Sequence, residues 1–280
     1  MKKITPALLR RWQLPALDSE LGKEARGHVL VVGGSDEIPG AVVLAAVGAL
    51  RAGAGTLEIA TTAGIAGNVA VAVPESRTRG LPSRRGELAS TRRLLADVAT
   101  CDTILLGPGM RDPASLRALV KAKTKATFVV DAGALKLYAQ RPPRLRAILT
   151  PHAGEMAELC GATKARILAD PEPIARDMAR RLHAVVALKG AATYVASPDG
   201  RVWLNTAGNL GLGTSGSGDT LSGVIAGLCA RGATPEQAAV WGVYLHARSG
   251  DLLAREIGPL GFLARELLDQ IPPLLARLSR

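Results

Sequence analysis

The sequence has few aromatic residues, few cysteines and no long hydrophobic run, and each shortage excludes a class of protein. Its 280 residues include only 3 Trp, 3 Tyr and 2 Phe, too few for the stacking platform of a single-strand nucleic-acid-binding protein. Cys101, Cys160 and Cys229 lie far apart and never form a C-x-x-C pair, so neither a disulfide framework nor a zinc ribbon is indicated. This cysteine usage fits a reducing compartment.

The hydrophobic segments are short. The longest, residues 41–50 and 221–230, are interrupted by glycine and fall below the roughly 18 apolar residues that a membrane-spanning helix needs. The first residues are basic but are not followed by the apolar stretch of a secretory signal. We therefore expect a cytoplasmic protein without a membrane partner.

The net charge is strongly positive. The 35 Lys and Arg residues exceed the 24 Asp and Glu residues, and the resulting charge of +11 fits a nucleic acid, an anionic surface or an anionic small molecule as partner. The densest positive run contains no aromatic residue, so its plainer interpretation is a solvated loop and helix face, and we expect no nucleic-acid partner. This run consists of Arg77, Arg79, Arg84, Arg85, Arg92 and Arg93.

Short β-branched segments alternate with longer segments of helical periodicity, the pattern of βαβ units around a mainly parallel sheet. The predicted strands are residues 28–32, 56–61, 102–106, 127–131, 147–150 and 184–188. The predicted helices are residues 40–52, 63–72, 87–99, 114–122, 153–161, 173–183, 219–231, 235–256 and 261–271. Segments 193–196 and 201–205 flank the turn sequence Ser-Pro-Asp-Gly, which predicts an antiparallel hairpin closing one edge of the sheet. No linker or repeat interrupts the chain, so we expect one α/β domain over residues 1–280.

Several segments whose residues could bind a ligand or take part in a reaction directly follow predicted strands. Ligands of open α/β sheets bind at the carboxyl ends of the strands. Each segment alone has the composition of an ordinary turn, but five of them at the same edge indicate a ligand site. They are Gly33-Gly34-Ser35-Asp36, Gly107-Pro108-Gly109, Asp131-Ala132-Gly133, residues 150–155 and Lys189-Gly190.

The most informative segment is the glycine-rich loop of residues 205–218, which runs into an apolar helix at Asp219. Glycines allow backbone N–H groups to converge on a phosphate, and the helix N-terminus adds its positive dipole end. The loop lacks the Gly-Lys-Ser/Thr of a Walker A motif, and it does not follow the first strand as a Rossmann fingerprint does. The sequence therefore predicts an anion hole with an acid beside it.

Asp219 has two interpretations. A carboxylate in the first turn of a helix can be a simple cap that the helix dipole stabilises. Beside a phosphate-binding loop, it can also be a general base that takes the proton from a hydroxyl as the oxygen attacks a phosphoryl group. We favour the general base.

The loop and its surroundings resemble a known superfamily. Gly216-Ser217-Gly218-Asp219, with Lys189-Gly190 upstream, resembles the signature of the ribokinase-like enzymes, which implies a three-layer α/β/α sandwich with a mainly parallel central sheet. More closely, segments along nearly the whole chain resemble the ADP-dependent NAD(P)H-hydrate dehydratases, and their combination is specific although no single one is. These segments are Gly33-Gly34-Ser35, Pro39-Gly40-Ala41, Gly107-Pro108-Gly109, residues 131–135, residues 149–152, Leu188-Lys189-Gly190 and residues 205–219.

The resemblance implies repair of hydrated NADH or NADPH. ADP phosphorylates the ring hydroxyl, and phosphate then leaves to restore the reduced nicotinamide. The step is chemically sensible because the conjugate acid of hydroxide has a pKa of about 15.7, whereas the second pKa of phosphate is about 6. The resemblance also implies Mg²⁺ on the nucleotide phosphates and a homotetramer, while the metal ligands stay unassigned.

The family positions carry over to this chain residue by residue. Asp219 matches the base, and the backbone of Ser215, Gly216, Ser217 and Gly218 matches the anion hole. The positions that line the hydrated dinucleotide correspond to Ala41, Gly109, His152 and Asp219. The positions that hold the nucleotide donor correspond to Lys189, Gly190, Ala191, Ala192, Thr193 and Gly218.

Two residues depart from the family pattern. Ala153 stands where a proline usually follows the histidine, and we expect this change to loosen the turn beside His152. Ser217 stands where the family usually has threonine. Since serine keeps both the hydroxyl and the backbone N–H, the anion hole should tolerate it.

Other residues have structural interpretations of comparable weight. Without the resemblance, His152 is best explained as the cap of the helix that begins near Ala153. Asp131 is equally a strand-end residue bonded to a neighbouring loop or a substrate or Mg²⁺ ligand, and Lys189 either binds phosphate or solvates the hairpin. The three cysteines are expected to fill the core. Packed or surface positions are expected for His28, His183, His246, Trp203 and Trp241, although either tryptophan could stack on a base.

Two other functions fit the same sequence. A small-molecule kinase of the superfamily would use the same loop and base with ATP but keep the phosphate on its product. A non-catalytic nucleotide-binding or nucleic-acid-binding protein would instead exploit the positive charge, and its binding would weaken steeply with salt.

Overall fold

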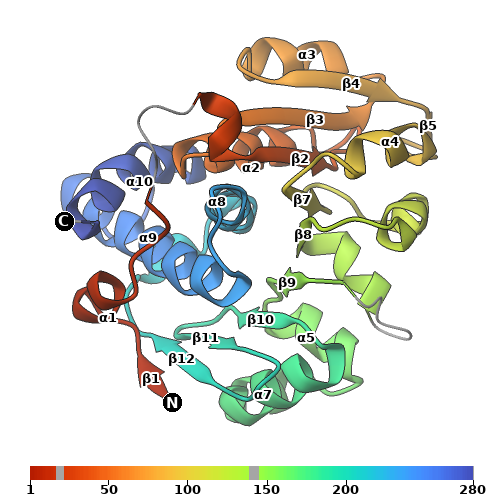
Figure 1. Cartoon of the computed structure of the whole chain (residues 1–280). Helices are drawn as coiled ribbons and strands as arrows, with labels where there is room; N and C mark the ends of the chain where they lie inside the picture. The colour runs from red at the N-terminus through yellow and green to blue at the C-terminus, as the bar shows by residue number, and fades with distance from the viewer. Residues whose placement is uncertain (17–21, 139–144, 280) are drawn as a thin grey trace.

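The computed structural model describes residues 1–16, 22–138 and 145–279. Its main feature is a ten-stranded sheet in the order β1-β12-β11-β10-β9-β8-β7-β2-β3-β4 (Figure 1). All neighbouring strands are parallel except at β11, which is antiparallel to both β10 and β12. The strands are β1 (Lys2–Lys3), β2 (His28–Val32), β3 (Thr56–Thr62), β4 (Arg77–Leu81), β7 (Thr103–Leu106), β8 (Thr127–Val130), β9 (Ala147–Leu149), β10 (Val185–Leu188), β11 (Thr193–Ala196) and β12 (Val202–Asn205). A separate hairpin pairs β5 (Ser83–Arg84) with β6 (Glu87–Leu88).

Helices cover both faces of the sheet because alternate side chains of each buried strand point to opposite faces. In β2, Val29 and Val31 belong to one hydrophobic core, whereas Leu30 and Val32 belong to the other. The first core is closed by α1 (Pro6–Arg11), α2 (Gly40–Arg51), α3 (Ala66–Ala72), α8 (Ser217–Ala230), α9 (Pro235–Glu256) and α10 (Ala264–Leu278). The second is closed by α4 (Leu95–Val98), α5 (Ala153–Cys160), α6 (Lys164–Ala169), α7 (Pro171–Leu182) and the 3₁₀ segments η2 (Arg92–Leu94), η3 (Ala114–Lys121) and η4 (Ala132–Tyr138). The predicted three-layer α/β/α arrangement is confirmed.

Helix α8 is the central helix of the first layer and carries the predicted anion hole at its N-terminus (Figure 1). Its main partner is α2, and glycines at the contact allow the two backbones to approach closely. A Cβ added to Gly223 would lie 2.1 Å from the carbonyl oxygen of Ala45, and one added to Gly227 would lie 2.2 Å from that of Ala49. This packing fixes where the first turn of α8 meets the carboxyl ends of the strands.

Most predicted boundaries agree with the structure to within a few residues, and the exceptions have local causes. The predicted helix 87–99 is wrong in its first half, which forms β6 and a short 3₁₀ turn. There the Thr91 hydroxyl donates to the carbonyl of Ser115 at 2.6 Å, a tertiary contact that links this segment to η3. Helix α10 begins later than predicted and continues through Pro272 and Pro273 to Leu278. The hairpin β11–β12 is not the outermost pair, because the unpredicted strand β1 adds beyond β12.

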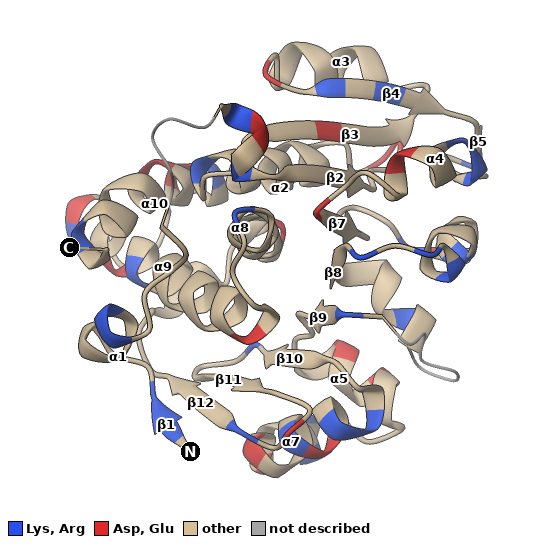
Figure 2. Ribbon diagram, in the orientation of Figure 1, with Lys and Arg blue, Asp and Glu red and all other residues tan. Residues whose placement is uncertain are grey.

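The arginine-rich run is more structured than predicted. Arg77 and Arg79 lie on edge strand β4, and Arg79 bridges Glu58 of β3 and Asp97 of α4. Burial raises the pKa of Glu58, although Arg79 opposes this effect, so the arginine partners a nearly inaccessible carboxyl group. The solvated interpretation is therefore wrong for Arg79. Figure 2 shows the other basic residues distributed over several outer elements.

None of the helices within the described residues combines the length and the hydrophobicity that crossing a membrane requires.

Candidate active site

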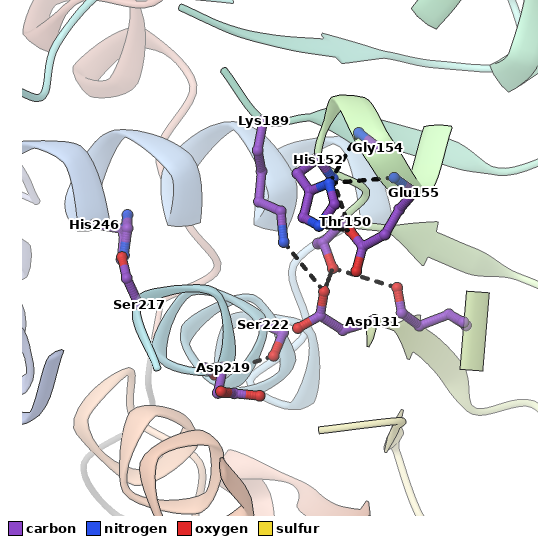
Figure 3. Close-up of polar contacts among 11 residues, drawn as sticks. Asp131, Thr150, His152, Gly154, Glu155, Lys189, Ser217, Asp219, Ser222 and His246 are labelled. Atoms are coloured by element: carbon purple, nitrogen blue, oxygen red, sulfur yellow. Dashed lines mark hydrogen bonds and ion pairs between the residues drawn. The ribbon is translucent and has the colours of Figure 1, made fainter. Parts of the chain in front are cut away.

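The carboxyl ends of β8, β9 and β10 bring three predicted polar residues together beside α8 (Figure 3). Asp131 follows β8 and is 2% exposed. Its Oδ1 accepts a hydrogen bond from the Thr150 hydroxyl at 2.7 Å and pairs with the Lys189 ammonium at 3.3 Å. Strand-end residues from three different strands thus form one buried polar cluster, as the sequence pattern predicted.

Asp219 lies in the first turn of α8, but its carboxylate does not cap that helix. The N-cap is Gly216, whose φ of +85° is a left-handed conformation that glycine adopts without strain. Burial raises the pKa of Asp219 to about 7, and the charge of Asp131 adds to the rise while Lys189 opposes it. A carboxyl group with a pKa near neutrality is well matched to accept and release a proton.

Lys189 is the cation of the cluster. Burial lowers the pKa of its ammonium, but Asp131, Glu155 and Asp219 together raise it above the ordinary value. The side chain is largely buried and points toward Asp131 in Figure 3. Lys189 therefore carries a positive charge beside the loop that is predicted to bind phosphate.

Two cavities meet at His152. One, of about 700 Å³, runs along the glycine-rich loop, and the other, of about 560 Å³, lies between the residues after β7 and β8 and helix α5. Six of the predicted nucleotide-binding and anion-hole residues line the larger cavity: Lys189, Gly190, Ala191, Thr193, Ser217 and Gly218. Ala192, Ser215 and Gly216 belong to the same segments but are not among the lining residues.

Ala41 and Gly109 come together from different loops. A Cβ added to Gly109 would lie 2.9 Å from the Cβ of Ala41, so the two residues are in contact. Neither lines either of the two cavities, although Met110, next to Gly109, lines the smaller one. The predicted pair therefore lies behind the lining of the smaller cavity, with Met110 as the adjacent lining residue.

His152 caps α5 and also contributes to both cavities. Its Nδ1 accepts the backbone N–H groups of Gly154 and Glu155 at 3.0 and 3.2 Å, and Glu155 in turn accepts the backbone N–H of His152. Since Nδ1 is an acceptor, the neutral ring carries its hydrogen on Nε2, which lies 3.7 Å from Oε2 of Glu155. The capping box forms with Ala153 in place of the family's proline.

His246, which was expected only at a packed or surface position, is a residue of the site. It lies on α9, lines the larger cavity, and its Nε2 is 3.0 Å from the Ser217 hydroxyl in the first turn of α8. Burial lowers the pKa of His246 to about 4, so its imidazole is neutral at physiological pH. The sequence signal was a histidine on a helix whose buried residues are mostly apolar.

The remaining expectations concern packing and metals. Cys101 and Cys229 are buried, whereas Cys160 is only partly buried. Trp241 is fully buried, and Trp203 stacks on Trp12 rather than lining either cavity. Among the residues that the structure describes, no group of three His, Cys, Asp or Glu side chains could hold a metal ion.

A three-layer sheet, a cavity of about 700 Å³ along the glycine-rich loop and a buried carboxylate in the first turn of the helix that follows define a protein with the ribokinase-like fold. Comparison with known proteins gives the family: residues 29–273 match the family model described as NAD(P)H-hydrate dehydratase. The chain belongs to this family.

Individual relatives agree with this assignment. The chain is 47% identical to the ADP-dependent (S)-NAD(P)H-hydrate dehydratase of Xanthomonas campestris, covering 100% of this chain and 98% of the relative. It is 42% identical to the bifunctional NAD(P)H-hydrate repair enzyme Nnr of Moorella thermoacetica, covering 99% of this chain but only 54% of that protein. The crystal structure of the ADP/ATP-dependent NAD(P)H-hydrate dehydratase of Bacillus subtilis, co-crystallised with ATP and Mg²⁺, superposes with a TM-score of 0.86 at 34% identity, covering 99% and 98% of the two chains.

Proposed function

We propose that this protein is an ADP-dependent (S)-NAD(P)H-hydrate dehydratase that phosphorylates the ring hydroxyl of hydrated NADH or NADPH and then eliminates phosphate. The observation that carries the proposal is the buried Asp219, whose pKa of about 7 suits a general base beside the anion hole. The larger cavity takes ADP and the smaller one takes the hydrated dinucleotide. The proposal also includes, from the family resemblance, a single functional unit over residues 1–280, a homotetramer and a cytoplasmic location.

Each residue has a defined part in the phosphoryl transfer. The ionised Asp219 accepts the hydroxyl proton as the hydroxyl oxygen attacks the β-phosphorus of ADP and AMP leaves. Backbone N–H groups of Ser215 to Gly218 stabilise the charge on the transferred phosphoryl group, and the Lys189 ammonium adds a positive charge beside it. The Nε2–H of His152 donates to the hydrated dinucleotide and orients it.

The second half of the reaction removes phosphate. The carbon–oxygen bond of the phosphorylated intermediate breaks, and the oxygen leaves with the phosphate. The neighbouring ring carbon loses a proton, which restores the double bond of the reduced nicotinamide. The products are NAD(P)H, AMP, inorganic phosphate and one released proton, so all atoms of the hydrate and of ADP are accounted for.

Mg²⁺ would neutralise phosphate charge when it binds with the nucleotide. This ion is usually held by phosphates and waters with few protein ligands. The lack of a three-ligand cluster in the described residues fits an ion carried in by the nucleotide, and we assign no residue as its ligand.

The proposal is tested by incubating the purified protein with hydrated NADH, Mg²⁺ and either ADP or ATP. The absorbance of reduced nicotinamide should return in proportion to the AMP formed from ADP and to the phosphate released. A stable phosphorylated product without return of absorbance would instead identify a small-molecule kinase. If neither ADP nor ATP restored the absorbance of reduced nicotinamide, although the protein still bound ADP, the dehydratase assignment would be contradicted.

His152 offers a separate prediction, because its two ring nitrogens have different tasks. His152→Ala removes both the cap and the Nε2–H, so we expect the free energy of unfolding to fall by about 1 kcal/mol and the KM for hydrated NADH to rise. His152→Asn supplies a good cap without a donor at the Nε2 position, so stability should be retained while KM still rises. Urea denaturation and steady-state kinetics distinguish the two effects. An unchanged KM in both variants would restrict His152 to capping.

A further inference from the structure

Asp131 is a buried ionisable group that the reaction steps above do not use. It is held from two sides, by the Thr150 hydroxyl and by the Lys189 ammonium. The next residue, Ala132, has a φ of +46°, an unusual conformation for a residue with a side chain. The backbone directly after Asp131 therefore adopts a conformation that is costly for a residue with a side chain.

The charges of three carboxylates, Asp131, Glu155 and Asp219, act on Lys189, but its ion pair is with Asp131. Its Nζ would be 3.2 Å from a Cβ added to Gly218, so the ammonium lies against the first turn of α8, one residue before Asp219. Within the described residues, the ion pair that Lys189 makes is with Asp131 and not with Asp219. Figure 3 shows the ammonium directed toward Asp131, with Asp219 farther along the same turn.

We propose that Asp131 is a positioning residue that holds the Lys189 ammonium away from the Asp219 carboxylate, so that Asp219 stays free to accept the hydroxyl proton of the substrate. The role of Asp219 in this statement rests on the proposed function. Without Asp131, the carboxylates left around the ammonium are Asp219 and Glu155, and Glu155 already accepts the backbone N–H of His152. A carboxylate that forms an ion pair with the ammonium is a poorer proton acceptor.

The charged surroundings of Asp219 are few. The groups that act on it are Asp131 after β8, Lys189 after β10 and Glu155 on α5. His246 on α9 faces Ser217 and is neutral, while Arg51, the charged residue of α2, pairs with Asp269 of α10. Asp131 raises the pKa of Asp219, whereas Lys189 lowers it. Loss of the Asp131 charge and release of the Lys189 ammonium would therefore both lower the pKa of Asp219.

The test is Asp131→Asn, which removes the charge and keeps the size. In the wild type, activity should rise with pH through about 7, because Asp219 works in its ionised form. In Asp131→Asn we expect this acidic limb of the kcat/KM profile to move down by about one pH unit. On the plateau, kcat should fall by up to about tenfold as the base weakens. Asp131→Ser serves the same purpose if the first variant does not fold.

Two matched variants separate positioning from mere structure. Asp131→Glu restores the carboxylate and should return the limb toward the wild-type position. Thr150→Val removes the hydrogen bond to Asp131 but keeps the ion pair, so the limb should stay within a few tenths of a unit. A folded Asp131→Asn variant with the wild-type limb would overturn the proposal.

A titration without turnover distinguishes this proposal from the proposed function. Carbon-labelled aspartate carboxyl groups are followed by NMR in wild type and Asp131→Asn, and Asp219→Asn assigns the Asp219 signal. Loss of the Asp131 charge lowers the pKa of Asp219 by itself, so the positioning role requires Asp131→Asn to lower it further in the wild-type background than in a Lys189→Met background. That result supports the positioning role even if hydrated NADH proves not to be a substrate. An identical titration in the two proteins contradicts it even if repair activity is found.

Discussion

Asp219→Asn should reduce the rate of NADH recovery from hydrated NADH by about 10²–10⁴-fold, the usual contribution of a general base. The amide has nearly the same shape as the carboxylate but cannot accept the hydroxyl proton. The loss should appear in kcat, while the affinity for ADP changes little, because the anion hole is built from backbone N–H groups. Steady-state kinetics and calorimetric titration with ADP measure the two quantities.

A neighbouring variant controls for disturbance of the helix. The Ser222 hydroxyl donates to the backbone carbonyl of Asp219 at 3.0 Å, one turn along α8. Ser222→Ala changes this turn without touching the carboxylate, so it should keep most of the activity. If Asp219→Asn retained more than about a tenth of the wild-type rate, the group would not be a general base of ordinary strength.

Gly223→Ala should have the largest effect on stability. The added methyl group would lie 2.1 Å from the carbonyl oxygen of Ala45, and this neighbour is helix backbone that cannot move aside cheaply. Overpacking of this kind costs typically about 1–3 kcal/mol, and we expect the upper end, together with lower activity because α8 carries the anion hole. Urea denaturation gives the free energy of unfolding.

Gly67→Ala is the matched control for this substitution. Gly67 lies inside α3, and a Cβ added there would meet nothing within 4 Å. Alanine should therefore stabilise this helix by about 0.5–1 kcal/mol. If both variants had the stability of the wild type, the contact between α2 and α8 would be looser than the structure shows.

The fold was predictable where the sequence repeats one physical pattern. Strands buried on both faces read as continuous apolar runs, and the long helix α9 was predicted with its bounds because a capping threonine and a proline precede an extended helical pattern. The region of residues 77–99 was not predictable in the same way. There, Arg79 is charged but largely buried, because its partners Glu58 and Asp97 come from distant positions in the chain.

The site was predictable to the extent that backbone geometry defines it. Glycine spacing and a helix start place the glycine-rich loop beside Asp219, and strand ends place Asp131 and Lys189. The pairing within the site depends on side-chain direction, which no local pattern encodes. The ion pair between Lys189 and Asp131 and the hydrogen bond between His246 and Ser217 both depend on how the helices and strands pack, so neither could be inferred from the sequence.

The most direct test of phosphorylation followed by elimination follows the hydroxyl oxygen itself. Hydrated NADH is prepared with a heavy oxygen isotope in its ring hydroxyl and is repaired with unlabelled ADP in unlabelled water. Since that oxygen attacks phosphorus and leaves with it, mass spectrometry should find the label in the inorganic phosphate, one labelled oxygen for each NADH formed. Label that appears in water, with unlabelled phosphate, would mean that hydroxide leaves directly and would contradict the role assigned to the anion hole and Asp219.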